Sequence, residues 1–412
     1  MKASIYLAAF ILLAGMTIIY CSDNSNKSTD PIEPPQLSAT ELSLLESSNS
    51  FAFDIFKELV AQEEDTNIFI SPLSMSYALT MTYNGADGQT EEAMKTVLGL
   101  GDYSREKINQ SFKSLTATLL TLDPSLIVEL ANSIWYRNAF EVEQEFIDIN
   151  QEYFDAEVLP KDFNSNQACN DINGWIEDKT NEKIQDIIDC PIDPMTIMFL
   201  INAIYFKGNW TVEFNPEETS PGIFYSPGGE VQCDMMNRYD EISHLFTDKF
   251  KAVNLPYGDE LFSMTMFLPK KSNSVDQFIA ELTEDKFNNW LSEFEIDSVD
   301  LYLPKFKFKY DKRLKEVLTN MGMAIAFQGN ADFSGINPTA DLYINDVIHG
   351  SFVQVDEKGT EAAAVTIVEI RYTSGPRNYI RVDRPFVFVI HEKTTGAILF
   401  MGKVINPIWQ DS

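Results

Sequence analysis

The stretch VQVDEKGTEAAAVTIVEIRYTSGP, residues 353–376, is a loop-like segment with the residue pattern of a strand. Its first four residues alternate valine with a polar side chain, which is the two-residue period of a half-buried strand. Between Gly359 and Ser374 there is no proline and no second glycine, so nothing in that interval prevents an extended conformation. Turn residues cluster only at the end, as Ser-Gly-Pro. We therefore predict an exposed segment that can also take a place in a sheet.

Counting in twos from Thr360 divides this segment into two faces. Glu361 and Glu369 fall on one face, and the other face carries only small or apolar residues: Thr360, Ala362, Ala364, Thr366, Val368 and Ile370. As a strand, the segment would turn its small side to a core and both carboxylates to water. A helix is an equal alternative for the first residues, because Thr360 is a good N-cap and Glu361 would lie in the first turn.

A resemblance favours the strand. The sequence EKGTEAAA matches the hinge of inhibitory serpins almost residue for residue. The predicted hinge comprises Glu357, Lys358, Gly359, Thr360, Glu361, Ala362, Ala363 and Ala364.

Further motifs in the same order extend the resemblance over residues 46–408. They include NIFISPLSMSYALTMTYNGADGQTEEAM at 67–94, NAIYFKGNW at 202–210 and RPFVFVIHEKTTGAILFMGKVINP at 384–407. In the first motif, Ser71 and Pro72 are predicted as the N-cap and the first residue of a helix. The resemblance implies an α+β serpin fold, with three β-sheets, eight or nine helices and an exposed reactive-centre loop. It also places four residues in a hydrogen-bonded shutter beneath the main sheet, which parts when the loop inserts: Ser71, Ser74, Asn202 and His349.

The function that the resemblance implies is inhibition of a serine endopeptidase, with cysteine endopeptidases as a second class. The protease attacks the loop as a substrate, and the cleaved loop then inserts into the main sheet with the protease still attached. The fifteen residues from Gly359 to Thr373 would span roughly 50 Å as a strand. The alternative is a non-inhibitory serpin that acts as a surface binding protein, but the small residues of the hinge favour inhibition.

The expected reactive bond follows from the family's spacing, in which the hinge glycine is the fifteenth residue before the bond. Starting at Gly359, this gives Thr373-Ser374 and favours an elastase-like target, because threonine is small. The alternative bond is Arg371-Tyr372, which a trypsin-like protease would cut; Tyr372 leaves a chymotrypsin-like cut open too.

Enzymatic activity is not expected. The motifs HExxH, GxSxG and CxxC are absent, and the chain has only three histidines, so few arrangements for acid–base or metal chemistry are available. We expect no cofactor and no metal. The net charge of −31 excludes a broad basic surface, so nucleic acid is not an expected partner. The expected partner is the target protease, bound by a monomer.

The first residues are predicted to direct export. Lys2 is followed by eighteen uncharged, mostly apolar residues before Cys21. A cysteine at this place resembles the lipidated residue of a bacterial lipoprotein, although Tyr20 stands where that motif has a small side chain. An uncleaved membrane anchor is the alternative, since eighteen residues reach the lower spanning limit. The protein is expected to be exported, as a lipoprotein of the cell envelope or in secreted form, with no other contact to the membrane.

Three parts are therefore predicted: a leader at 1–21, a flexible linker rich in Ser, Asp and Pro at 22–45, and one serpin domain at 46–412. With Cys21 set aside, an odd number of cysteines remains, without metal-type spacing: Cys169, Cys190 and Cys233. We interpret them as small buried apolar residues, with a Cys169–Cys190 bridge as the alternative.

Overall fold

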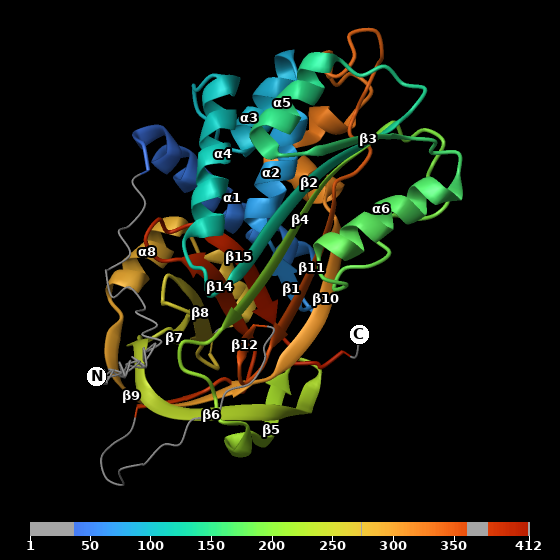
Figure 1. Cartoon of the computed structure of the whole chain (residues 1–412). Helices are drawn as coiled ribbons and strands as arrows, with labels where there is room; N and C mark the ends of the chain where they lie inside the picture. The colour runs from blue at the N-terminus through green and yellow to red at the C-terminus, as the bar shows by residue number, and fades with distance from the viewer. Residues whose placement is uncertain (1–36, 273, 361–377, 411–412) are drawn as a thin grey trace, which may run out of the picture. The chain divides into compact units, whose positions relative to one another are not determined.

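The computed structural model describes residues 37–272, 274–360 and 378–410 (Figure 1). Two β-sheets and nine α-helices occur in these residues, which confirms the predicted α+β class. The helices are α1 (Ala39–Gln62), α2 (Pro72–Tyr83), α3 (Gly88–Val97), α4 (Arg105–Thr121), α5 (Gln144–Phe154), α6 (Asn166–Lys179), α7 (Val275–Ala280), α8 (Glu284–Ser292) and α9 (Lys315–Leu318).

The first sheet has six strands in the order β10-β11-β12-β4-β2-β3. Neighbouring strands are antiparallel except β2 and β3, which are parallel. Their bounds are β2 (Ile127–Arg137), β3 (Glu157–Lys161), β4 (Met198–Asn209), β10 (Phe306–Arg313), β11 (Ile348–Val355) and β12 (Gly359–Thr360). The alternating burial of Val353 and Val355, both 0% exposed, confirms the strand predicted for the start of the key segment.

The second sheet has nine strands, in the order β1-β15-β14-β8-β7-β6-β9-β13 with β5 paired to β6. Its strands are β1 (Ile68–Ile70), β5 (Ser220–Ser226), β6 (Gly229–Phe246), β7 (Phe250–Tyr257), β8 (Phe262–Pro269), β9 (Glu295–Pro304), β13 (Asn378–Arg381), β14 (Phe386–Glu392) and β15 (Ile398–Val404). Three sheets are expected from the family, and two of them are joined here. The junction is β6, whose 18 residues pair with β5 and β9 along most of their length and with β7 at residues 243–246.

Capping residues mark where helices α1 and α2 begin. Ser71 accepts a hydrogen bond from the backbone N–H of Ser74 and Pro72 is the first residue of α2, as predicted. The predicted linker at 22–45 extends too far, because α1 begins at Ala39. Ser38 forms a capping box with Glu41, and the apolar residues that follow bury themselves at once.

The core consists of two apolar clusters. The larger one fills the space between the sheets and the helices, and α2 packs against both β4 and β15. The smaller one lies where α6 contacts β2 and β4, and also includes residues of the chain after α6. Its buried members are Trp135, Phe163, Ala168, Cys169, Ile172, Ile176, Ile184, Ile188 and Ile192. In Figure 1, α6 lies against one face of the six-stranded sheet, where it contacts β2 and β4.

Both edges of the six-stranded sheet are protected. At one edge, the N–H of Lys307 in β10 donates to the carbonyl oxygen of Ile408 (2.8 Å), and the N–H of Gln410 donates to the carbonyl oxygen of Lys307 (2.9 Å). At the other edge, β3 contains Pro160, which has no N–H to offer. Among the described residues, no helix is long and apolar enough to cross a membrane.

Candidate functional site

The hinge enters the six-stranded sheet as a two-residue strand. β12 lies between β11 and β4, with Thr360 opposite Val355 on one side and Gly208 on the other. A tight turn reverses the chain after β11, since Asp356 and Gly359 exchange backbone hydrogen bonds of 3.0 and 3.3 Å. The start of the loop is therefore already seated as a strand.

Gly359 permits this close approach to β4. Its φ is +154°, and a Cβ at this position would overlap the carbonyl oxygen of Gly208 and lie 2.7 Å from the Cα of Asn209. Any other residue would push β12 away from β4, so the glycine of the predicted hinge is required by the backbone.

Thr360 points into the core. It is 5% exposed, and its hydroxyl lies 2.7 Å from the hydroxyl of Tyr257. Burial raises the pKa of Tyr257, against a smaller opposite effect of this hydrogen bond. The Tyr257 ring stacks on Trp210 at a centroid distance of 4.5 Å, and the indole N–H of Trp210 donates to the carbonyl oxygen of Asp356 (3.0 Å). Two aromatic rings thus hold the turn and the first inward-facing residue of the hinge.

Glu357 is the other anchor of the hinge. Its carboxylate lies 2.9 Å from Nζ of Lys305 and accepts a hydrogen bond from the hydroxyl of Thr219 (2.8 Å). Burial acts to raise the pKa of Glu357, but the hydrogen bonds from Lys305, its own backbone and Thr219, together with the Lys305 charge, lower it overall. Nothing in the sequence patterns points to Tyr257, Lys305 or Thr219, because each comes from a distant strand or turn.

The gap between β4 and β11 continues beyond the two residues of β12, and we call this gap the slot. In the part of the chain that the structure describes, these two strands are joined through β12 and do not pair directly with each other. A cavity lies at this place, next to Thr360. It is lined by Phe69, Thr180, Lys183, Ile184, Ile204, Tyr205, Phe206, Phe352, Gln354, Thr360, Ile390 and Phe400. The slot is mainly apolar and begins where the hinge ends.

The four residues of the predicted shutter lie together beneath the sheet. The N–H of Ser71 donates to Nε2 of His349 (3.3 Å), and the hydroxyl of Ser71 donates to the carbonyl oxygen of Leu399 (2.8 Å). The hydroxyl of Ser74 donates to Oδ1 of Asn202. Burial lowers the pKa of His349 to about 3, so the ring is neutral and accepts at Nε2. The role of the cluster as a gate stays a prediction.

Asn132 extends this cluster and was missed by sequence reasoning. The Asn202 amide donates to Oδ1 of Asn132 (2.6 Å), and the Asn132 amide donates to the carbonyl oxygen of Phe154 (2.6 Å). Asn132 stands directly opposite Asn202 in the β2–β4 pair. The signal that could have found it is a second asparagine in an otherwise largely apolar stretch, ELANSIWY at residues 129–136.

The remaining predicted site residues lie outside the described residues, and their roles stay predictions. They are Cys21, Glu361, Ala362, Ala363, Ala364, Arg371, Tyr372, Thr373 and Ser374. No group of three or more His, Cys, Asp or Glu side chains placed to hold a metal ion occurs in the part that is described.

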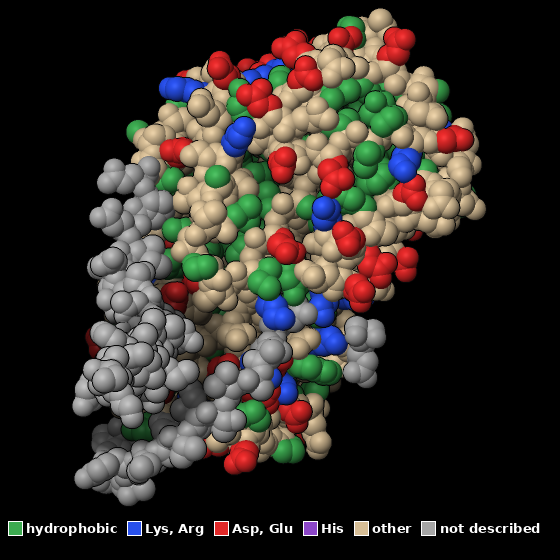
Figure 2. All heavy atoms as spheres, viewed as in Figure 1, with side chains coloured by type: hydrophobic (Ala, Val, Ile, Leu, Met, Phe, Trp, Pro, Cys, Tyr) green, Lys and Arg blue, Asp and Glu red, His purple; other side chains and the backbone are tan. Residues whose placement is uncertain are grey.

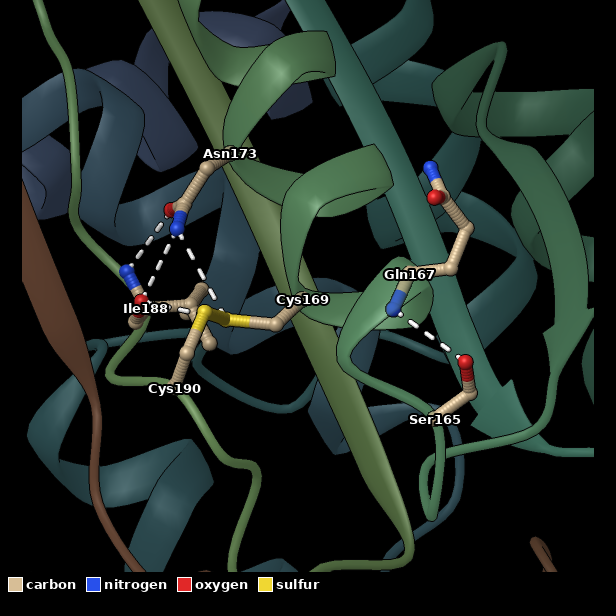
Figure 3. Close-up of a disulfide and its surroundings, with 6 residues drawn as sticks. All are labelled: Ser165, Gln167, Cys169, Asn173, Ile188 and Cys190. Atoms are coloured by element: carbon tan, nitrogen blue, oxygen red, sulfur yellow. Dashed lines mark hydrogen bonds between the residues drawn. A yellow bond between two sulfur atoms is a disulfide. The ribbon is translucent and has the colours of Figure 1, made fainter.

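The interpretation of the cysteines as separate apolar residues is wrong for two of them. Cys169 in α6 and Cys190 form a disulfide (Figure 3). The two residues are 21 positions apart, and the chain after α6 turns back to bring them together. Cys233 is a free, half-buried thiol whose pKa burial raises to about 11.

The acidic balance of the chain is visible on its surface. Figure 2 shows Asp and Glu side chains spread over the described part of one face, while a few Lys and Arg side chains gather towards its lower middle. No broad basic surface appears in the described part of this face.

The fold and the seated hinge define a protein with a six-stranded sheet in which a two-residue strand, β12, separates β4 from β11, with a small cavity beside Thr360. The sequence profile of the family described as Serpin (serine protease inhibitor) matches residues 46–407. An uncharacterized serpin-like protein of Thermococcus kodakarensis is 36% identical over 366 residues, which cover 87% of this chain and 84% of that protein. Ipis-1 of Ixodes persulcatus is 35% identical over 377 residues, which cover 88% of this chain and 99% of that protein.

Solved structures agree. The thermophilic serpin Tengpin in its native state has a TM-score of 0.82 and 31% identity, covering 91% of this chain and 96% of its own. Human thyroxine-binding globulin complexed with thyroxine has a TM-score of 0.82 and 30% identity, covering 90% of this chain and 100% of its own. The chain belongs to the serpin family, a family of serine protease inhibitors rather than of enzymes.

Proposed function

We propose that this serpin inhibits serine endopeptidases as a suicide substrate, with cysteine endopeptidases as a second target class. The observation that carries the proposal is β12: the hinge residues Gly359 and Thr360 occupy a strand position between β11 and β4, and the apolar slot continues beyond them. A loop that begins in this way can extend along the slot without changing its register.

The chemistry uses the protease's own first step. The protease serine attacks the carbonyl carbon of Thr373, the bond to the nitrogen of Ser374 breaks, and the amine leaves with a proton. The protease then carries an ester to Thr373. Water would normally hydrolyse this ester, and inhibition requires that insertion comes first.

Insertion is favourable for two physical reasons. A strand between β4 and β11 gains backbone hydrogen bonds on both sides, each worth about 0.5–1.5 kcal/mol net. Its inward side chains join an apolar slot lined by residues such as Ile204, Phe206 and Phe352. A fully inserted strand from Gly359 to Thr373 is roughly 50 Å long, so the attached protease is carried far from its first position.

The target class follows from the residue before the bond. Thr373 favours a protease with a shallow, elastase-like pocket, whereas Arg371 would serve a trypsin-like protease. Mass spectrometry of the released C-terminal fragment separates these cases. A fragment that begins at Ser374 supports the first bond and one that begins at Tyr372 the second, while cleavage only beyond Pro376 contradicts both.

The test of the mechanism is a covalent complex that survives denaturation. Incubation with an elastase-like and a trypsin-like protease, followed by denaturing gel electrophoresis, should give a band at the summed mass. A non-inhibitory binding protein is the second candidate function, and the likeness to thyroxine-binding globulin favours it. That function predicts cleavage without a complex, and saturable binding of a small molecule.

We also propose that the protein is exported and held to the cell envelope by lipid on Cys21, with the following residues as a tether. The Cys169–Cys190 disulfide supports an extracytoplasmic location, because disulfides persist in oxidising compartments. Cells fed a labelled fatty acid should label the protein but not its Cys21→Ser variant. Equal labelling of both would contradict the lipid anchor.

A further inference from the structure

The slot between β4 and β11 has a cover. After α6, which contacts β2 and β4, the chain crosses towards β11. Thr180 and Ile184 line the slot itself, and Ile184 and Ile187 pack directly over Gly350 of β11. We call residues 180–193, from the end of α6 to the far side of the slot, the covering segment.

Near its far end, the covering segment makes a solvent-exposed ion pair with β10. Asp189 forms an ion pair with Arg313, the last residue of that strand. The segment therefore bridges the two halves of the sheet, which are otherwise joined across the slot through β12 in the described residues.

Two links attach the same part of the covering segment to α6 (Figure 3). The Asn173 amide donates to the carbonyl oxygen of Ile188 and accepts from its N–H, both at 2.9 Å. Two residues further on, the disulfide joins Cys190 to Cys169, which is fully buried in α6. Ile188 lies beneath these links in the smaller core.

A strand that enters the slot must disturb this cover. Successive side chains of a strand point to opposite faces, so half of those entering would meet α6 and the covering segment. A full strand also holds its two neighbours roughly 9–10 Å apart, twice the spacing of adjacent strands. The halves bridged by the covering segment must then separate, and the segment must shift or lift.

We propose that the Cys169–Cys190 disulfide is a redox-controlled latch on this cover, opened by a dithiol reductant, and that its reduction accelerates insertion of the loop. The inference rests on the proposed function. When the disulfide is formed, it limits how far the covering segment can move away from α6. When the disulfide is reduced, the Asn173 hydrogen bonds and the apolar contacts are the remaining links to α6.

The exchange chemistry is feasible at this place because the two cysteines differ in exposure. Cys190 lies in an exposed stretch, whereas Cys169 is 0% exposed. A thiolate of the reductant attacks the sulfur of Cys190, the S–S bond breaks, and Cys169 leaves as a thiolate that takes up a proton. The second thiol of the reductant then displaces Cys190, so the protein gains two thiols and the reductant becomes a cyclic disulfide.

The first experiment measures the cover itself. Hydrogen exchange of residues 180–193 is compared in the intact protein before and after treatment with dithiothreitol, with thiol titration to prove that the bond has opened. We expect faster exchange in this segment and unchanged exchange in α2. Unchanged exchange in the segment would overturn the latch whether or not the protein inhibits proteases.

The second experiment measures insertion. A synthetic peptide of the sequence 360–373 is added, and its incorporation is followed on native gels for the oxidised protein, the reduced protein and the Cys190→Ser variant. We expect incorporation to be roughly tenfold faster without the disulfide, since the opening motion no longer works against a closed loop. Cys233→Ser is the matched control and should respond to dithiothreitol like the unmodified protein.

The outcomes separate the two proposals. Equal incorporation rates with the disulfide closed and open would overturn the latch and leave the inhibitory mechanism intact. If neither form takes up peptide and loop cleavage does not raise thermal stability, the proposed function is contradicted. The proposed effect of the disulfide on insertion is then contradicted too. Slower incorporation after reduction would contradict the direction that we propose.

Discussion

Replacing Thr360 with Arg should convert the inhibitor into a substrate. In the intact protein, Thr360 is 5% exposed and shares a hydrogen bond with Tyr257. Loss of that bond costs about 1 kcal/mol, and the hinge can withdraw from the sheet to keep the arginine in water. The fold should therefore survive, because β12 contributes only two residues to the sheet.

The larger effect comes after cleavage. For the loop to insert, the guanidinium must move into an apolar position beside Tyr257. No Asp or Glu side chain of the described residues lines the cavity next to Thr360, so the charge would have no partner there. An unpaired buried charge costs several kcal/mol. If only about 2.7 kcal/mol of this appears in the barrier, insertion slows roughly 100-fold. Hydrolysis of the acyl-enzyme then comes first in most encounters.

The assay is the number of inhibitor molecules consumed for each protease molecule trapped. Thr360→Arg should raise this number severalfold or more, with cleavage at the same bond and active protease left over. Glu361→Arg is the matched control, because the two-residue pattern puts position 361 on the opposite face. Undiminished inhibition by Thr360→Arg, or equal loss in both variants, would refute the insertion mechanism as argued from Thr360.

Three further predictions concern stability. Cleavage anywhere between Ile370 and Ser374 should raise the melting temperature sharply, and equal melting of intact and cleaved protein would show that no insertion occurs. Burial lowers the pKa of His349 to about 3, so only the unfolded chain takes up this proton as the pH falls below about 6.5. Stability should therefore fall steadily as the pH drops from about 6.5 towards 3, and urea unfolding at several pH values should give a flatter curve for His349→Gln. Lys305→Met leaves the Glu357 carboxylate without its cation, and hydrogen exchange at 356–360 should quicken; unchanged exchange would mean that this ion pair does not hold the hinge.

The sequence predicts the local elements well because local physics decides them. Ser71 and Pro72 begin α2 since a hydroxyl cap and a missing N–H both suit a helix start. Val353 and Val355 are buried as the two-residue period requires. The seating of Gly359 in the sheet agrees with the strand interpretation of the hinge, against the helical alternative, at the two hinge residues that form β12.

What the sequence does not reveal depends on contacts between distant residues. The Cys169–Cys190 bond was only the alternative interpretation of the cysteines, because it depends on the chain after α6 folding back onto this helix and no spacing rule predicts that return. Tyr257 reaches the hinge from β7 and Lys305 from the junction of β9 and β10, so their partners cannot be assigned without the sheet order. The start of α1 at Ala39 was missed since the polar linker composition runs into a helix that is stabilised by burial further along.

The proposed insertion of a strand into the middle of a sheet raises the question of whether a strand could also pair at the borders of that sheet. Here the backbone of Lys307 is already bonded to Ile408 and Gln410, and Pro160 interrupts the opposite border. A second molecule that approaches side-on finds the backbone groups of Lys307 already paired and no N–H on Pro160, so strand pairing is disfavoured at these two points. The chain at Ile408 and Gln410 thus disfavours pairing of a strand from a second molecule at Lys307.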